Sequence, residues 1–115
     1  MRLTTSLWAS ALVRRVFSSG GFAAILRHGA DSAGAIFLIE RTRLGSEILY
    51  GPAPQADYES GRPEERLFVR IAEYDLPGEA ADRIAREARF DPDLWLVEIE
   101  PGADPLDRLV PLSAA

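Results

Sequence analysis

Two short runs of the sequence alternate between apolar residues and other residues with a period of two, and they constrain the fold more than any other feature. The runs span residues 66–72 and 94–100. Alternation of this kind is typical of a β-strand whose two faces meet different surroundings. We expect both runs to lie in one sheet, with one apolar set facing its core. That set comprises Leu67, Val69, Ile71, Trp95, Val97 and Ile99.

Two other segments have the period of an amphipathic helix. Residues 5–18 follow a threonine that suits an N-cap, and they end before the glycine pair 20–21. A second helix should begin near Pro77 and carry Arg86 and Arg89 in its last turn. We expect both helices to pack on the same face of the sheet.

Short β-type runs separated by turn residues fill the chain between the two helices. The segments 22–28, 35–41 and 47–50 predict a meander of three antiparallel strands, because glycine-rich turns separate them. Residues 51–65 hold several glycines and prolines without periodicity and predict a long exposed loop. The strand at 66–72 follows this loop.

The order is therefore one helix, four strands, one helix and one strand. This order predicts an α+β fold, with a mainly antiparallel sheet of about five strands and two helices packed on one face. A crossover through the second helix would make the 66–72 and 94–100 strands parallel neighbours. We assign residues 1–100 to this single domain and residues 101–115, which contain three prolines, to a C-terminal tail.

The composition excludes several classes of site. All 13 basic residues are arginine, and the 115-residue chain contains neither lysine nor cysteine. Schiff-base lysines, P-loop lysines, thiolate metal sites and cysteine nucleophiles are therefore excluded. No uncharged apolar stretch approaches the ~18 residues that span a bilayer. We expect a cytoplasmic protein that makes no membrane contact.

The charge is distributed unevenly along the chain. Residues 1–30 carry four arginines and no acid, whereas the remaining residues carry nine arginines and all 18 acids. Arg14, Arg15 and Arg27, with aromatic residues nearby, have the composition of a nucleic-acid patch. The acidic remainder would repel phosphates, so the balance disfavours nucleic acid as a partner.

Three segments together resemble a known bacterial family. They are Leu3–Trp8, Leu49–Gln55 and Phe90–Glu100. Across nearly its whole length the chain is similar to family fourteen-ninety-one of the domains of unknown function (DUF1491), a set of short bacterial proteins. The resemblance implies no activity, ligand or catalytic residue, so each candidate residue is weighed on its own chemistry.

The acidic residues between 91 and 100 are the strongest candidates for a catalytic site. Asp91, Asp93, Glu98 and Glu100 would supply oxygen ligands for Mg²⁺ or Mn²⁺ if their carboxylates converged. The alternative is structural, because an aspartate beside a β-run is an ordinary turn residue and alternating glutamates mark the exposed face of an outer strand. The only histidine, His28, has no nucleophile-elbow pattern with it and is typical of a structural residue.

The segment around Gly51–Gln55 is the strongest candidate for a binding element. Its prolines hold an extended shape at low entropic cost. Tyr50, Gln55 and Tyr58 lie in or beside the segment. Arg66 and Arg70 add positive charge on the next strand. The alternative is a rigid connector whose tyrosines pack on the sheet edge.

Two functional hypotheses follow from these residues. We favour a non-catalytic protein-interaction or oligomerisation module, with no cofactor, whose partner is a protein or a second copy of the chain. Its contact surface would be the sheet face around Phe68, Leu94 and Leu96, or the Leu7 side of the first helix. The alternative is a divalent-metal hydrolase that uses the carboxylates from 91 to 100, with Arg66 or Arg70 stabilising negative charge.

Overall fold

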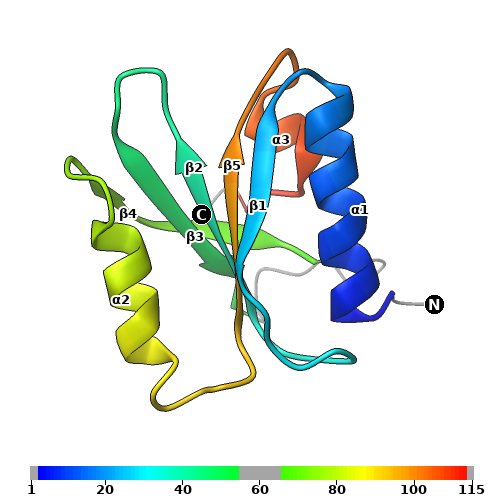
Figure 1. Ribbon diagram of the computed structural model, residues 1–115, viewed down its shortest axis with the longest axis vertical. Coiled ribbons are helices and arrows are strands. Elements are labelled where there is room, and N and C mark those ends of the chain that lie inside the picture. Colours follow the sequence, from blue (N-terminus) through cyan, green and yellow to red (C-terminus); the bar gives the residue numbers. More distant parts are fainter. Residues whose placement is uncertain (1–2, 55–65, 114–115) are drawn as a thin grey trace.

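The chain folds as an α+β domain with a five-stranded sheet, in the element order expected from the sequence (Figure 1). The computed structural model describes residues 3–54 and 66–113. The elements are α1 (Thr5–Ser18), β1 (Phe22–Arg27), β2 (Ile36–Arg41), β3 (Glu47–Pro52), β4 (Phe68–Tyr74), α2 (Glu79–Glu87), β5 (Trp95–Glu100) and α3 (Leu106–Leu109). No helix in these ranges has the length and apolar character needed to cross a bilayer.

The last strand of the chain lies inside the sheet. The strand order is β1-β5-β2-β3-β4, and β5 pairs antiparallel with β1 and parallel with β2. The expected pairing of residues 22–28 with 35–41 is therefore wrong. The parallel pairing of β4 with β5, which the sequence left open, does not occur, because β3 and β2 lie between them. The other predicted antiparallel pair, β2 with β3, is confirmed.

The glycine-rich connection between β1 and β2 explains this arrangement. It wraps around the residues that lead into β5, and Ala30 N–H donates to the carbonyl of Asp93 at 3.0 Å. A Cβ atom on Gly29 or Gly34 would lie 2.0 or 2.3 Å from that same carbonyl oxygen. These glycines therefore permit a close backbone approach to the β5 segment instead of closing a hairpin.

The two long helices cover opposite faces of the sheet, which corrects the expectation that both pack on one face. On one side, Ala9, Leu12 and Val16 of α1 pack in a core with Trp95, Val97 and Ile99. On the other side, α2 packs in a second core. The described members of the second core are Ile39, Leu49, Ala80, Ile84, Ala88, Leu94 and Leu96. Because β5 is apolar on both faces, it needs a helix on each.

Strand β4 presents a different face to the core than the alternation predicted. Phe68 is buried in the α1-side core, whereas Ile71 is 37% exposed and Leu67 and Val69 are half-buried. The pairing of β4 with β3 contains a register shift beside Tyr50, which changes the facing of the residues along it. The alternating set on β5 is confirmed, since Trp95, Val97 and Ile99 are all fully buried.

Residues 101–113, which belong to the expected tail, pack on the same face as α1. Leu106 and Leu109 of α3 are buried in the α1-side core. Arg15 of α1 donates to the backbone carbonyls of Arg108 and Leu109. Residues 111–113 then run alongside the start of β4, where Phe68 and Leu112 form a parallel bridge.

A buried carboxylate joins α2 to the sheet. The side chain of Glu47 at the start of β3 is only 2% exposed. Its Oε1 accepts hydrogen bonds from the N–H groups of Gly78 and Ala80, at 3.2 and 3.4 Å. Its Oε2 lies 3.2 Å from Arg41, which also binds Glu98. Glu47 therefore serves as the acceptor that the left-handed cap residue Gly78 does not supply.

Candidate functional site

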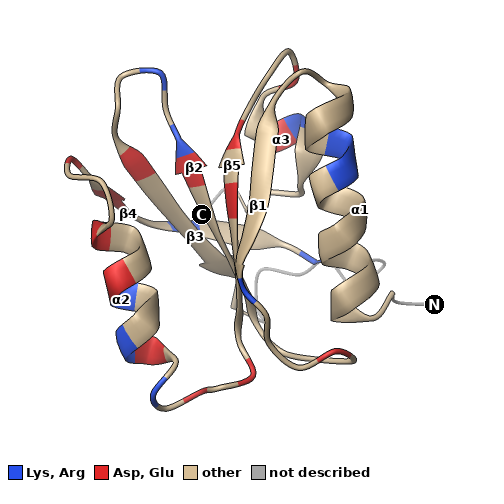
Figure 2. Ribbon diagram, viewed as in Figure 1, with Lys and Arg blue, Asp and Glu red and all other residues tan. Residues whose placement is uncertain are grey.

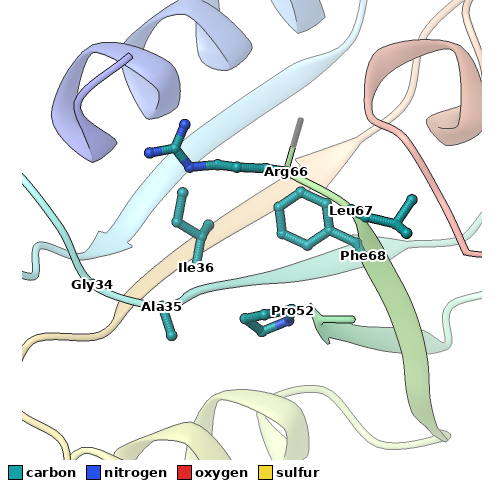
Figure 3. A pocket seen from close by; sticks show the side chains of 7 residues that line it. All are labelled: Gly34, Ala35, Ile36, Pro52, Arg66, Leu67 and Phe68. Carbon is teal, nitrogen blue, oxygen red and sulfur yellow. The ribbon is translucent and has the colours of Figure 1, made fainter. Parts of the chain in front are cut away.

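A hollow opens at the end of the sheet where β2 and β4 begin and β3 ends (Figure 3). Its volume is about 150 Å³. The side chains of Ile36, Pro52 and Phe68 converge on it, and Arg66 extends along one side. Gly34, Ala35 and Leu67 complete the lining, so most of its wall is apolar.

A second hollow of about 290 Å³ adjoins the first, because Gly34 and Arg66 line both. Its wall is more polar than that of the first. The hydroxyl-bearing residues Thr4, Thr5 and Ser32 line it. Arg66 therefore lies at the boundary between an apolar compartment and a polar compartment. We refer to the two hollows together as the Arg66 cavity.

The first turns of α1 hold the guanidinium of Arg66 in place. Its Nη2 donates to the carbonyl of Leu3 at 2.9 Å and lies 3.4 Å from the hydroxyl of Thr5. Its Cζ lies 5.7 Å from the ring centroid of Trp8, within the range of a cation-π contact. Helix α1 has no acidic residue in its first turn, so its positive N-terminal end adds to the charge of Arg66.

The structure separates Tyr50 and Arg70, two of the other sequence-predicted binding residues, from this cavity. Tyr50 is buried in the α1-side core and donates its hydroxyl to Glu40 at 3.0 Å. Burial, reinforced by the negative charge of Glu40, raises the pKa of Tyr50 to about 12. Arg70 forms an exposed ion pair with Glu73 at 2.6 Å. Gln55 and Tyr58 lie outside the described residues.

The acidic residues proposed for a metal site do not converge. Asp91 accepts a hydrogen bond from the N–H of Asp93 at 3.2 Å, in a turn before β5. Glu98 lies near the far end of β5, whereas Asp93 lies before that strand begins. Glu98 is bound by Arg41 at 2.6 Å, and Glu100 is exposed. In residues 3–54 and 66–113 no three His, Cys, Asp or Glu side chains could hold a metal ion.

The surface expected for a partner is also buried. Phe68 packs under α1 and α3, and Leu94 and Leu96 pack under α2. They are not available for contact, which corrects that part of the interaction hypothesis. The remaining expected surface, around Leu7 on α1, is exposed.

A different apolar surface lies along the edge strand β1. Phe22 and Leu26 are 45% and 47% exposed. Phe17 of α1 extends this surface, because its ring contacts that of Phe22 edge-on at 5.6 Å. Between residues 22 and 26 the strand carries no charged side chain, as the uniform colour of β1 in Figure 2 shows. We call Phe17, Phe22, Ala24 and Leu26 the β1 edge surface.

Comparison with known proteins places the chain in a family. The profile described as "Protein of unknown function (DUF1491)" matches residues 3–106. The chain belongs to the DUF1491 family. A search of curated proteins gives no match.

Solved structures of similar proteins have the same fold. A protein from A. tumefaciens, solved in solution, is 49% identical with a TM-score of 0.79, and the match covers 97% of this chain and 95% of that one. A crystal structure of a DUF1491 family protein from Caulobacter crescentus CB15 is 31% identical with a TM-score of 0.75, covering 96% and 99%. An NMR structure from the same organism is 30% identical with a TM-score of 0.76, covering 99% of each chain.

Proposed function

We propose that this DUF1491 protein is a non-catalytic interaction module that pairs with a second copy of itself through the β1 edge surface. The observation that carries the proposal is the contrast between the two edges of the sheet. Strands β1 and β4 are both edge strands. Among the described residues, β4 carries a charged pair and a covering segment, whereas β1 is uncharged from residue 22 to residue 26 and has a register shift only near its end.

Strand β4 is protected in two ways. It carries the charged pair Arg70 and Glu73. Its first residue is covered by the C-terminal segment, since Phe68 N–H donates to Pro111 and its carbonyl accepts from Ser113. Charged residues and a covering segment are standard means of blocking an edge.

In residues 3–54 and 66–113, neither protection is found over the regular part of strand β1. Residues 22–25 pair regularly with β5, and the register shifts only after Ile25. An exposed, uncharged apolar edge is a template for another strand. The free backbone groups of β1 and the exposed side chains of Phe22 and Leu26 therefore favour a strand partner.

The edge is also complementary to itself. An antiparallel pairing centred on Ala24 brings Phe22 of one copy towards Leu26 of the other, which lies at the register shift, with the small Ala24 at the two-fold axis. The basic end of the edge, at Arg27, then approaches the acidic end of the other copy, where Glu100 neighbours Phe22. The strand that carries Arg27 and the strand of the other copy that carries Glu100 are two strand spacings, or ~10 Å, apart. The two side chains together are long enough to bridge this distance. This match favours a second copy over an unrelated strand.

Mass measurement by light scattering at tens of micromolar tests the proposal. The wild-type chain should show twice its monomer mass of 12.6 kDa. Phe22→Glu should raise the dimer Kd more than tenfold, because the two-fold axis repeats each substitution and removes two apolar contacts. Leu44→Glu is the matched control, since Leu44 is 97% exposed on the turn after β2.

A wild-type chain that remains monomeric at several hundred micromolar would refute the proposal. Equal weakening by Phe22→Glu and Leu44→Glu would place the contact elsewhere. Circular dichroism of each variant separates loss of pairing from loss of fold. The cytoplasmic location expected from the sequence stays a prediction, which fractionation of the native cells would check.

A further inference from the structure

A third hollow, of about 450 Å³, lies between α2 and the end of β4. Its lining comprises Tyr74 of β4, Arg83, Arg86 and Glu87 of α2, and Phe90 just after α2. We call it the Phe90 hollow. It shares no lining residue with the Arg66 cavity and includes no residue of the β1 edge surface. Its volume lies within the range of roughly 300–1,000 Å³ that is usual for binding sites.

The positive groups of the Phe90 hollow have no carboxylate partner in the described part of the chain. Arg86 makes no ion pair there, and neither does the neighbouring Arg89. Arg83 donates to a neutral group, the hydroxyl of Tyr74, at 3.1 Å. Figure 2 shows basic residues along the later part of α2 and just beyond it. An anionic group that enters the hollow would therefore meet unpaired guanidinium groups.

An uncovered aromatic ring lies beside these charges. Phe90 lines the hollow, yet 90% of its surface is exposed. The chain continues in a helical turn after α2, because Phe90 N–H donates to the carbonyl of Glu87 at 3.0 Å. The spacing of Arg83, Arg86 and Phe90 therefore places them along one side of the helix. Exposed aromatic residues beside arginines are typical of the residues that contribute most to protein contacts.

We infer that the Phe90 hollow binds an acidic peptide segment of a partner protein, with an apolar side chain against Phe90 and carboxylates towards Arg83 and Arg86. Charge complementarity selects this partner. The two arginines lie one helical turn apart, and the side chains on one side of an extended peptide repeat about every 7 Å. Arginine side chains are long enough to accommodate this difference.

The charge of the rest of the molecule disfavours nucleic acid at the same place. The chain has a net charge of -5, and Glu87 lies in the lining itself. A run of phosphates would extend beyond the arginines into this negative surroundings. A short peptide with a few carboxylates interacts mainly with the nearest charges, because salt screens interactions beyond about 8 Å.

One of the two arginines is oriented before a partner binds. Tyr74 packs against the core under α2, and its hydroxyl holds the guanidinium of Arg83. The planar fork of a guanidinium matches the two oxygens of a carboxylate. An arginine that is already oriented loses less conformational entropy on binding.

Titration of the ¹⁵N-labelled full chain with the peptide acetyl-Glu-Glu-Phe-Glu-Glu-amide, followed by amide NMR, tests the inference. Saturable shifts should appear at Arg86, Glu87 and Phe90, with a Kd of about 1 mM or tighter. A peptide with alanine in place of its phenylalanine should bind at least about tenfold more weakly, and so should one with glutamine in place of its glutamates. A short oligouridylate should bind at least about tenfold more weakly as well.

Three variants locate the contact. Arg86→Glu and Phe90→Ala should each weaken peptide binding at least about tenfold. Arg43→Glu is the matched control, because it makes the same change of charge at an exposed arginine that does not line the hollow, and it should leave binding unchanged. All three side chains are exposed, and circular dichroism of each variant checks that it folds.

The peptide comparison uses the wild-type chain and does not depend on how any variant folds. Absence of saturable shifts at about 10 mM peptide, where a site with a Kd of about 1 mM would be nearly full, would overturn the inference. Equal binding of the alanine peptide or of oligouridylate would also overturn it, as would equal weakening by Arg86→Glu and Arg43→Glu. Phe22→Glu should leave peptide binding unchanged, so the outcome is separate from that of the pairing through the β1 edge surface.

Discussion

Removing the carboxylate of Glu47 should detach the beginning of α2 from the sheet. This side chain accepts two hydrogen bonds from the first residues of α2 and pairs with Arg41. Glu47→Ala removes a helix cap, worth about 1 kcal/mol, and an ion pair to a half-exposed arginine, worth about 1 kcal/mol. It also leaves a space where the buried side chain was, which adds about 1 kcal/mol.

The free energy of unfolding should therefore fall by about 3 kcal/mol, a large part of the 5–15 kcal/mol typical of a domain. The melting temperature should fall by roughly 12 °C, at about 4 °C per kcal/mol for a chain of this length. Glu47→Gln keeps the volume and one acceptor oxygen and loses only the charge, so it should cost about 1–2 kcal/mol. Arg41 retains Glu98 in both variants, which limits the damage on that side.

Urea unfolding followed by circular dichroism measures these differences. Glu73→Ala is the matched control, because Glu73 also pairs with an arginine but is exposed, so it should cost much less than Glu47→Ala. If Glu47→Ala cost no more than Glu73→Ala, the assignment of Glu47 as the acceptor that holds α2 would be wrong.

Two further predictions concern the α1-side core. The pKa of Tyr50, raised by burial and by Glu40 from 10.0 to about 12, implies stabilisation that is complete below pH 10 and lost as the pH rises through 12. An absorbance titration should therefore show a tyrosine ionisation step near pH 12, and Tyr50→Phe should remove that step. A titration in which Tyr50→Phe removes no step near pH 12 would contradict the prediction. Leu12→Ala, at a fully buried position of α1, should cost about 3 kcal/mol, whereas Leu7→Ala, at a position 58% exposed, should cost less than about 0.5 kcal/mol. Similar losses for the two leucines in urea unfolding would mean that α1 presents another face to the sheet.

The elements themselves could be predicted because their signals are local. The threonine cap and the glycine pair set the bounds of α1, and alternation alone located β5. The sequence analysis assigned one apolar face to each strand. That assignment could not show on which side of the sheet each helix packs. Leu94 and Leu96, on the second face of β5, were the available signal that the strand is covered on both sides.

The candidate sites were less accessible to sequence reasoning, because they join residues far apart in the chain. Arg66 was a candidate, but its contacts with Leu3 and Thr5 span about sixty residues and leave no local pattern. The uncharged run from Phe22 to Leu26 was visible in the sequence. The run indicates a contact surface only because β1 is an edge strand. That position follows from the insertion of β5 between β1 and β2.

That insertion also governs when the molecule can assemble during synthesis. Among the described strands, β1 has one neighbour in the sheet, β5, which ends at Glu100. Helix α1 and strand β1 therefore cannot join the other strands until the ribosome has added about seventy more residues. Contacts so distant in sequence slow folding and leave apolar segments uncovered in the meantime. A nascent chain stalled before residue 95 would hold two unjoined pieces.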